Sequence, residues 1–120
     1  MFNSLETLLQ TVNVQTRSEK NYELQIKKLL EDYAYTIVRG DHKNYMPDWL
    51  AIDYNGVATF IECKNYRGSR TEKEAWRKCQ TTERRKYQKS KERRSVEDAG
   101  IVLYCVSYNG EETFVKRGLK

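Results

Sequence analysis

The sequence lacks any long apolar run, and no stretch approaches the roughly 20 residues that a membrane-spanning helix requires. The first residues, MFNSLETLLQ, also lack the basic region and the cleavage site of a signal peptide. We therefore expect a cytoplasmic protein with no membrane partner. A chain of 120 residues can bury one hydrophobic core but not two, which predicts a single domain over residues 1–120.

Cysteine is scarce, and its spacing indicates neither a disulfide framework nor a zinc site. Cys63, Cys79 and Cys105 are an odd number, lie far apart and include no C-x-x-C pair. Cys63 and Cys105 fall within apolar runs that are typical of strands. We expect these thiols to be buried.

Charge is abundant but unevenly distributed. Residues 64–94 hold 13 Lys or Arg and 4 Glu, a local net charge of +9, which leaves −4 for the rest of the chain. Such a basic segment suits a polyanion, and nucleic acid is the usual one; the alternative is a solvated helix face. The candidate phosphate contacts, which would position a duplex without reading its sequence, are Arg84, Arg85, Lys86, Lys89, Lys91, Arg93 and Arg94.

Periodicity and turn residues predict the order helix, strand, strand hairpin, helix, strand, strand. The predicted strands cover 35–39, 49–53, 57–63, 101–107 and 113–115. The predicted helices are a short one within 1–17 that Ser4 could cap, one over 18–33 that Ser18 could cap, and one over 71–98. The last has few apolar residues, so we expect it to lie on the sheet by one edge, and it could divide at Thr81-Thr82. We divide the domain into an N-terminal helical extension (1–17), a core (18–107) and a C-terminal strand and tail (108–120). The apolar stripe of the extension either completes the core or meets a second subunit.

The hairpin around Asn55-Gly56 decides whether two acidic residues share a face. A two-residue loop places Asp48 and Glu62 on opposite faces. A three-residue loop, Tyr54 to Gly56, pairs Asp48 with Glu62 and puts both, with Lys64, at the open end of an otherwise apolar face. We favour this second register, in which Gly56 takes a left-handed position that suits glycine.

Two neighbouring carboxylates repel each other unless a cation lies between them, and oxygen ligands suit Mg²⁺ or Mn²⁺. Asp48 and Glu62 are the candidate ligands, and the backbone carbonyl of Cys63 could add another. Glu23 could approach from the 18–33 helix, directly or through water. Lys64 would orient the attacking water or stabilise charge on the phosphoryl oxygens.

Pro47-Asp48, followed after thirteen residues by Glu62-Cys63-Lys64, resembles the PD-(D/E)XK nuclease signature. The predicted order of elements is similar to the αβββαβ core of that superfamily, and the resemblance covers residues 18–107. Within it, the chain most resembles the small stand-alone VRR-NUC domains of phages and, more distantly, archaeal-type Holliday-junction resolvases. This resemblance implies a restriction-endonuclease-like α/β fold, with a central mixed sheet flanked by helices. A phage-encoded protein of this kind would act in the host cytoplasm.

The resemblance also implies a Mg²⁺-dependent phosphodiesterase that cuts DNA, often as a homodimer, and leaves 5′-phosphate and 3′-hydroxyl ends. Asp48 and Glu62 carry over as metal ligands and Lys64 as the catalytic lysine. Glu23 carries over as a further acidic residue, although Glu19 lies one turn away. A helical glutamine of VRR-NUC domains is similar to Gln88, which joins the candidate contacts to DNA.

Three further side chains have two interpretations each. His42, the only histidine, could be catalytic, but we favour a polar loop residue at the mouth of the site. Trp49 and Trp76 could stack on bases, but we favour packing in the core.

The leading hypothesis is a metal-dependent endonuclease that recognises branched or junction DNA by charge and shape and has no small-molecule substrate. The alternatives are a catalytically inactive nucleic-acid-binding module and a structural protein with a solvated basic face.

Overall fold

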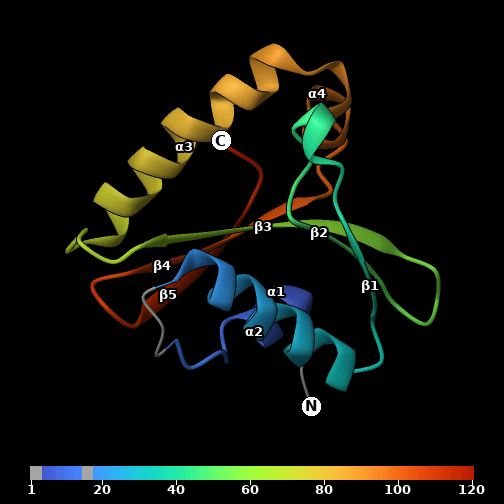
Figure 1. The fold of residues 1–120 in the computed structure, drawn as a ribbon, viewed down its shortest axis with the longest axis horizontal. Helices are drawn as coiled ribbons and strands as arrows, with labels where there is room; N and C mark the ends of the chain where they lie inside the picture. Colours follow the sequence, from blue (N-terminus) through green and yellow to red (C-terminus); the bar gives the residue numbers. More distant parts are fainter. Residues whose placement is uncertain (1–3, 15–17) are drawn as a thin grey trace.

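The computed structural model describes residues 4–14 and 18–120. It contains one five-stranded mixed sheet in the order β1-β2-β3-β4-β5, with helices on both faces (Figure 1). The predicted α/β class with a central mixed sheet is therefore confirmed. The strands are β1 (Thr36–Arg39), β2 (Trp49–Ile52), β3 (Ala58–Tyr66), β4 (Val102–Tyr108) and β5 (Glu112–Arg117).

The pairing explains which strands are buried. β3 and β4 are parallel, and the other neighbouring pairs are antiparallel. β4 lies between β3 and β5, and six of its seven residues are buried; a strand covered on both faces reads as a continuous apolar run. β3 extends to Tyr66, three residues beyond the predicted end, because residues 64–66 continue the parallel ladder with β4.

Helices α1 (Leu5–Leu9) and α2 (Glu19–Asp32) cover one face of the sheet. The predicted caps are confirmed, since the hydroxyls of Ser4 and Ser18 accept hydrogen bonds from the backbone N–H groups of Thr7 and Asn21. These helices pack on side chains from alternate positions of the strands, and they form an apolar core with Trp49, Ala51, Ile61, Cys63, Leu103 and Cys105.

Helices α3 (Glu72–Lys89) and α4 (Lys91–Asp98) cover the opposite face. As predicted, α3 contacts the sheet along one edge, with Ala75 and Cys79 fully buried. Trp76 makes edge-on ring contacts with Tyr104 and Phe114, so the expected packing role is confirmed. All three cysteines are free and buried.

The 71–98 segment does form two helices, but it does not divide at Thr81-Thr82, because α3 continues through both residues. The Thr81 hydroxyl donates to the carbonyl of Arg77, a local bond that a helix accommodates. The chain breaks at Ser90 instead, where the backbone is extended (φ −129°, ψ 120°). The Ser90 hydroxyl caps α4 by accepting from the N–H of Arg93 and donates to the carbonyl of Asn44 at 2.5 Å. A tertiary contact thus fixes the break.

A short 3₁₀ helix, η1 (His42–Asn44), lies in the predicted polar loop between β1 and β2. His42 is exposed there, as expected of a polar loop residue. Along the described chain, no helix combines the length and apolar character needed to cross a bilayer.

Candidate active site

The β2–β3 hairpin has the favoured register. Trp49 pairs with Ile61, and the N–H of Asp53 donates to the carbonyl of Val57 at 3.0 Å, which leaves a loop of three residues. Gly56 has φ +82°, the left-handed conformation predicted for it. Extending this pairing by one residue places Asp48 opposite Glu62.

Asp48 is 7% exposed, and its Oδ2 accepts a hydrogen bond from the N–H of Cys63 at 2.8 Å. Burial raises the pKa of this carboxyl to about 6, and Glu23 raises it as well, whereas hydrogen bonding with Glu62 and Cys63 opposes the shift. Asp48 therefore interacts with acidic side chains from both α2 and β3.

Glu23 and Glu19, the two acidic candidates on α2, contact different parts of the site. Glu23 interacts with Asp48, and its backbone carbonyl accepts a hydrogen bond from the indole N–H of Trp49 at 3.0 Å. Trp49 is thus a buried packing residue, as favoured, and it also fixes α2 beside Asp48. Glu19 instead accepts from the N–H of Asn65, with its other oxygen 3.9 Å from the Lys64 ammonium.

Gly40 allows the chain to bring Asp48 into this position. Its N–H donates to the carbonyl of Asp48 at 2.9 Å. A Cβ at residue 40 would lie 1.7 Å from the carbonyl oxygen of Pro47, which is impossible without displacing the backbone. The glycine that ends β1 is therefore required for the close approach of the segment that carries Asp48.

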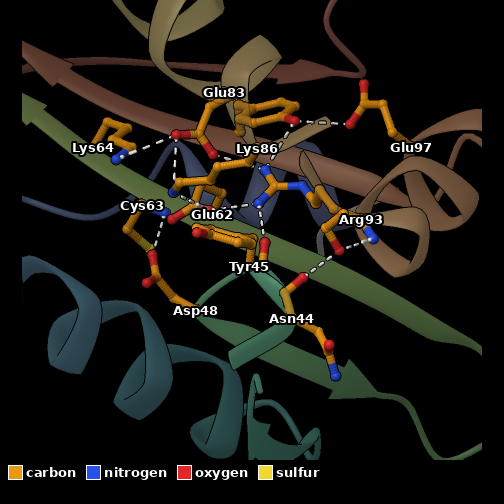
Figure 2. A network of polar contacts seen from close by, with 12 residues as sticks. Asn44, Tyr45, Asp48, Glu62, Cys63, Lys64, Glu83, Lys86, Arg93 and Glu97 are labelled. Atoms are coloured by element: carbon orange, nitrogen blue, oxygen red, sulfur yellow. Dashed lines mark hydrogen bonds and ion pairs between the residues drawn. The ribbon is translucent and has the colours of Figure 1, made fainter. Parts of the chain in front are cut away.

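Glu62 is held by two cations from the helices on the other side of β3 (Figure 2). Its Oε1 is 3.3 Å from the Lys86 ammonium and 3.2 Å from Nη1 of Arg93. Burial, followed by Glu83 and Asp48, raises the pKa of Glu62 well above its usual range, and Lys86 opposes this shift. The carboxyl is 3% exposed, so its charge depends on these partners.

Glu83 is a second buried carboxylate, one that the sequence analysis missed. It is fully buried and contacts Nη2 of Arg93 at 2.7 Å, the Lys86 ammonium at 3.0 Å and the Lys64 ammonium at 3.3 Å. Burial would raise its pKa, but the three cations outweigh burial and lower the pKa to about 2. Glu83 is therefore the ionised centre of the network at neutral pH.

Lys64 lies at the edge of this network, with its ammonium between Glu83 and Glu19. Burial lowers its pKa, but Glu83, Glu62 and Glu19 outweigh that effect and raise it above the usual range. Lys64 therefore remains protonated at neutral pH. This state suits stabilisation of negative charge and excludes proton abstraction by Lys64 in this arrangement.

Arg93 joins both carboxylates to the β1–β2 loop. Its guanidinium donates to Glu62, to Glu83, to the carbonyl of Tyr45 at 2.8 Å and to the hydroxyl of Tyr104 at 3.1 Å. Arg93 is 1% exposed, so the prediction that it contacts phosphate is wrong. Its positive charge is used inside the protein.

The remaining basic candidates divide by exposure. Lys86 is half-buried in the ion network, and Arg94 is half-buried with its guanidinium donating to the carbonyl of Tyr87. The candidates that are exposed on α3 and at the start of α4 are Arg84, Arg85, Gln88, Lys89 and Lys91.

Tyr104 and Glu97 hold Arg93 through two further hydrogen bonds in series. The Tyr104 hydroxyl, which accepts from Arg93, donates to Oε2 of Glu97 at 2.7 Å. The other oxygen of Glu97 accepts from the backbone N–H of Leu119 at 2.7 Å. The arrangement around Glu62 is therefore tied to α4, β4 and the segment after β5.

The sequence held one signal for Glu83. Ala75, Cys79 and Glu83 follow one another at four-residue intervals, so they share a face of α3, and the first two are among the few apolar residues of that helix. No such local pattern identified Arg93, since Ser90 turns α4 away from the axis of α3.

The oxygen ligands needed for a hard divalent cation are present in part. Within residues 4–14 and 18–120, no three His, Cys, Asp or Glu side chains converge to hold a metal ion. Mg²⁺ sites commonly use only one or two carboxylates, with water and substrate oxygens completing the shell, and Asp48 and Glu62 satisfy that requirement. Pro47, opposite Cys63 in the extended register, has no N–H with which to occupy the Cys63 carbonyl. These groups fit Mg²⁺ or Mn²⁺ bound mainly by Asp48 and Glu62.

Known proteins offer no match from which this chain could be identified. No protein-family model matches the chain, nor does any curated protein or solved structure.

Proposed function

We propose that this chain is a divalent-metal-dependent DNA endonuclease with a PD-(D/E)XK-type site on a restriction-endonuclease-like core. The observation that carries the proposal is the register of the β2–β3 hairpin, which brings together Asp48, Glu62 and a protonated Lys64. Burying two carboxylates and an ammonium together costs stability. Perturbed pKa values of this kind cluster at functional sites, which supports a function for these charges.

Asp48 and Glu62 would hold Mg²⁺ or Mn²⁺, with the Cys63 carbonyl as a further oxygen ligand and Glu23 acting on Asp48 from α2. When bound, the cation neutralises charge on the phosphodiester and favours ionisation of a nearby water. Asp48 must be ionised to bind the cation, so its raised pKa ties metal binding to pH.

The protein's own side chains then have separate roles. Lys64, held by Glu83 and Glu19, places a fixed positive charge beside Glu62 where negative charge grows on the phosphoryl oxygens. Arg93 and Lys86 fix Oε1 of Glu62, which orients the rest of that carboxyl. The exposed residues Arg84, Arg85, Gln88, Lys89 and Lys91 would bind the DNA backbone.

We include two further features in this proposal. The protein acts as a homodimer, because symmetric cutting of two strands needs two sites and one protomer supplies one. Its substrate is DNA selected by structure, since the exposed basic residues of α3 and α4 offer phosphate contacts and none of the described helices and strands resembles a base-reading module.

Purified protein incubated with Mg²⁺ and with supercoiled plasmid or four-way-junction DNA tests the activity. We expect nicking that disappears with EDTA and falls at least about 100-fold in Glu62→Gln and in Lys64→Met. Arg77→Ala, an exposed change on α3 away from the ion network, is the matched control and should cleave normally. Equal cleavage by all four proteins would refute the assignment.

The second candidate function is a nucleic-acid-binding module without nuclease activity. The exposed basic residues of α3 favour this function, because they are available to DNA whether or not Asp48, Glu62 and Lys64 support catalysis. It predicts salt-sensitive DNA binding with no metal-dependent nicking of linear, supercoiled or junction DNA.

A further inference from the structure

Tyr45 has an unusual backbone conformation beside the candidate active site. Its φ is 57° and its ψ is 28°, the left-handed region that bulky side chains rarely adopt. Two other non-glycine residues have positive φ in the described chain, Ala34 after α2 and Asn109 in the β4–β5 turn. Both occupy positions where this conformation is common. Tyr45 ends η1, where glycine or asparagine would be less strained.

The backbone of Tyr45 is held in place by the site itself. Arg93, which also contacts Glu62, donates to the Tyr45 carbonyl at 2.8 Å, and the Ser90 hydroxyl donates to the neighbouring Asn44 carbonyl at 2.5 Å. Figure 2 shows Tyr45 alongside Glu62 and Arg93. Strain that is maintained next to a site points to a function for the residue concerned.

The side chain of Tyr45 is open to a ligand. It is 41% exposed, which is unusual for a large aromatic residue anchored so firmly. The Lys89 ammonium lies 5.9 Å from the centre of the ring, and Lys43 and Lys91 on neighbouring segments are exposed. An exposed ring with a cation beside it suits stacking on a nucleobase while that cation contacts an adjoining phosphate.

We propose that Tyr45 is a stacking platform for an unpaired nucleobase beside the site formed by Asp48 and Glu62. Bases within a duplex have both faces covered by their neighbours, so only an unpaired or displaced base can offer a face to the ring. The site therefore selects DNA with an unpaired nucleotide, such as a flap or a branch, over intact duplex. This inference rests on the proposed function and specifies its substrate.

Binding without cleavage tests the stacking role. Fluorescence anisotropy in Ca²⁺ would compare an intact duplex with the same duplex carrying a single-stranded flap, and 2-aminopurine in the flap would report stacking. We expect Tyr45→Asn, which tolerates the left-handed backbone, to weaken flap binding about 10-fold. Duplex affinity should stay within about twofold of wild type, and the 2-aminopurine quenching should be lost. Tyr45→Phe should keep both properties.

Tyr54→Asn is the matched control, because Tyr54 is 85% exposed in the hairpin loop at the opposite end of β2. It should bind both DNAs as wild type does. Unchanged flap binding by Tyr45→Asn, or an equal loss on both DNAs in a folded variant, would overturn the stacking proposal even if the protein cuts DNA. Conversely, a ring-dependent flap preference without Mg²⁺-dependent cleavage would leave stacking intact and refute the nuclease.

Discussion

The two faces of the sheet bury different kinds of side chain. The face under α1 and α2 is an apolar core, in which Tyr22, Ile26 and Leu30 pack on alternate positions of the strands. The face under α3 and α4 combines an apolar cluster with the buried ions Glu62, Glu83 and Arg93. Burying charge costs more than burying hydrocarbon, even when the ions are paired. Burial of hydrocarbon therefore accounts for most of the first face, whereas the buried ions of the second face need a further explanation.

The strongest test of this contrast removes the central cation. Arg93→Met keeps most of the side-chain volume but leaves the half-buried Lys86 as the one cation that Glu62 and Glu83 still share. We expect the free energy of unfolding, measured by urea denaturation, to fall by about 3–5 kcal/mol. Ile26→Val, a matched deletion on the apolar face, should cost only about 0.5–1.5 kcal/mol. A loss of similar size in both variants would mean that the ion network has no special place in stability.

The pH dependence should separate Asp48 from Glu83. The folded state raises the pKa of Asp48 from 3.8 to about 6, so it binds an extra proton between these values and loses stability as pH rises through that window. This loss amounts to about 3 kcal/mol. Asp48→Asn, which stays neutral, should flatten this slope and be more stable than wild type at pH 7, although inactive. Urea denaturation at intervals from pH 4 to 7 would measure both effects.

Glu83 should behave in the opposite sense. Its pKa is lowered from 4.5 to about 2 in the folded state, so it stabilises the protein above pH 4.5 and loses that contribution as pH falls toward 2. Glu83→Gln should therefore be less stable than wild type at pH 7 and approach it near pH 2. A parallel pH profile for Glu83→Gln and wild type would contradict the assignment of Glu83 as the ionised centre.

Substitution of Gly40 tests whether its close contact with the backbone of Pro47 is needed for stability and for the position of Asp48. In Gly40→Ala, the new methyl group would meet the carbonyl of Pro47, and the backbone that carries Asp48 must move. We expect a loss of about 1–3 kcal/mol in stability, together with weaker Mn²⁺ binding by calorimetry. Gly68→Ala is the control, because a Cβ there meets nothing within 4 Å.

The smallest effect on stability should come from the exposed basic face. Arg85→Ala and Lys89→Ala should each change the free energy of unfolding by less than about 0.5 kcal/mol. Each should also reduce the slope of log affinity for DNA against log salt by about 1. Salt titrations by fluorescence anisotropy would show this, and an unchanged slope would remove these residues from the DNA-binding surface.

The features that were predicted correctly depend on the conformational preferences of residues close together in the sequence. Alternating apolar positions and the Asn55-Gly56 turn were enough to place β2 and β3. They left two registers open, and we favoured the three-residue loop because it brings Asp48, Glu62 and Lys64 to one end of a face. The observed pairing has that loop. Ser4 and Ser18 marked helix starts for an equally local reason. The restriction-endonuclease-like identity of the core remains a prediction.

The buried ion network and the break at Ser90 were not predicted, because both depend on contacts between residues far apart in the sequence. The Glu62–Arg93 pair joins residues 31 positions apart, and the end of α3 at Ser90 depends on Asn44, 46 positions away. No helical or strand period connects such residues. Charge counting also assigned Arg93 and Lys86 to the surface, since composition cannot distinguish a solvated cation from one that neutralises buried carboxylates.

The central position of β3 has a consequence for how the site adapts to a ligand. Its backbone is bonded to β2 on one side and, through the parallel ladder, to β4 on the other. The amides of Ile61 and Leu103, which lie within these ladders, should therefore exchange with deuterium only on global unfolding, whereas those of residues 41–43 should exchange through local opening. Adjustment at the proposed site would then come from residues 41–43 of the β1–β2 loop, because Ser90 and Arg93 hold the carbonyls of Asn44 and Tyr45 and β3 stays still.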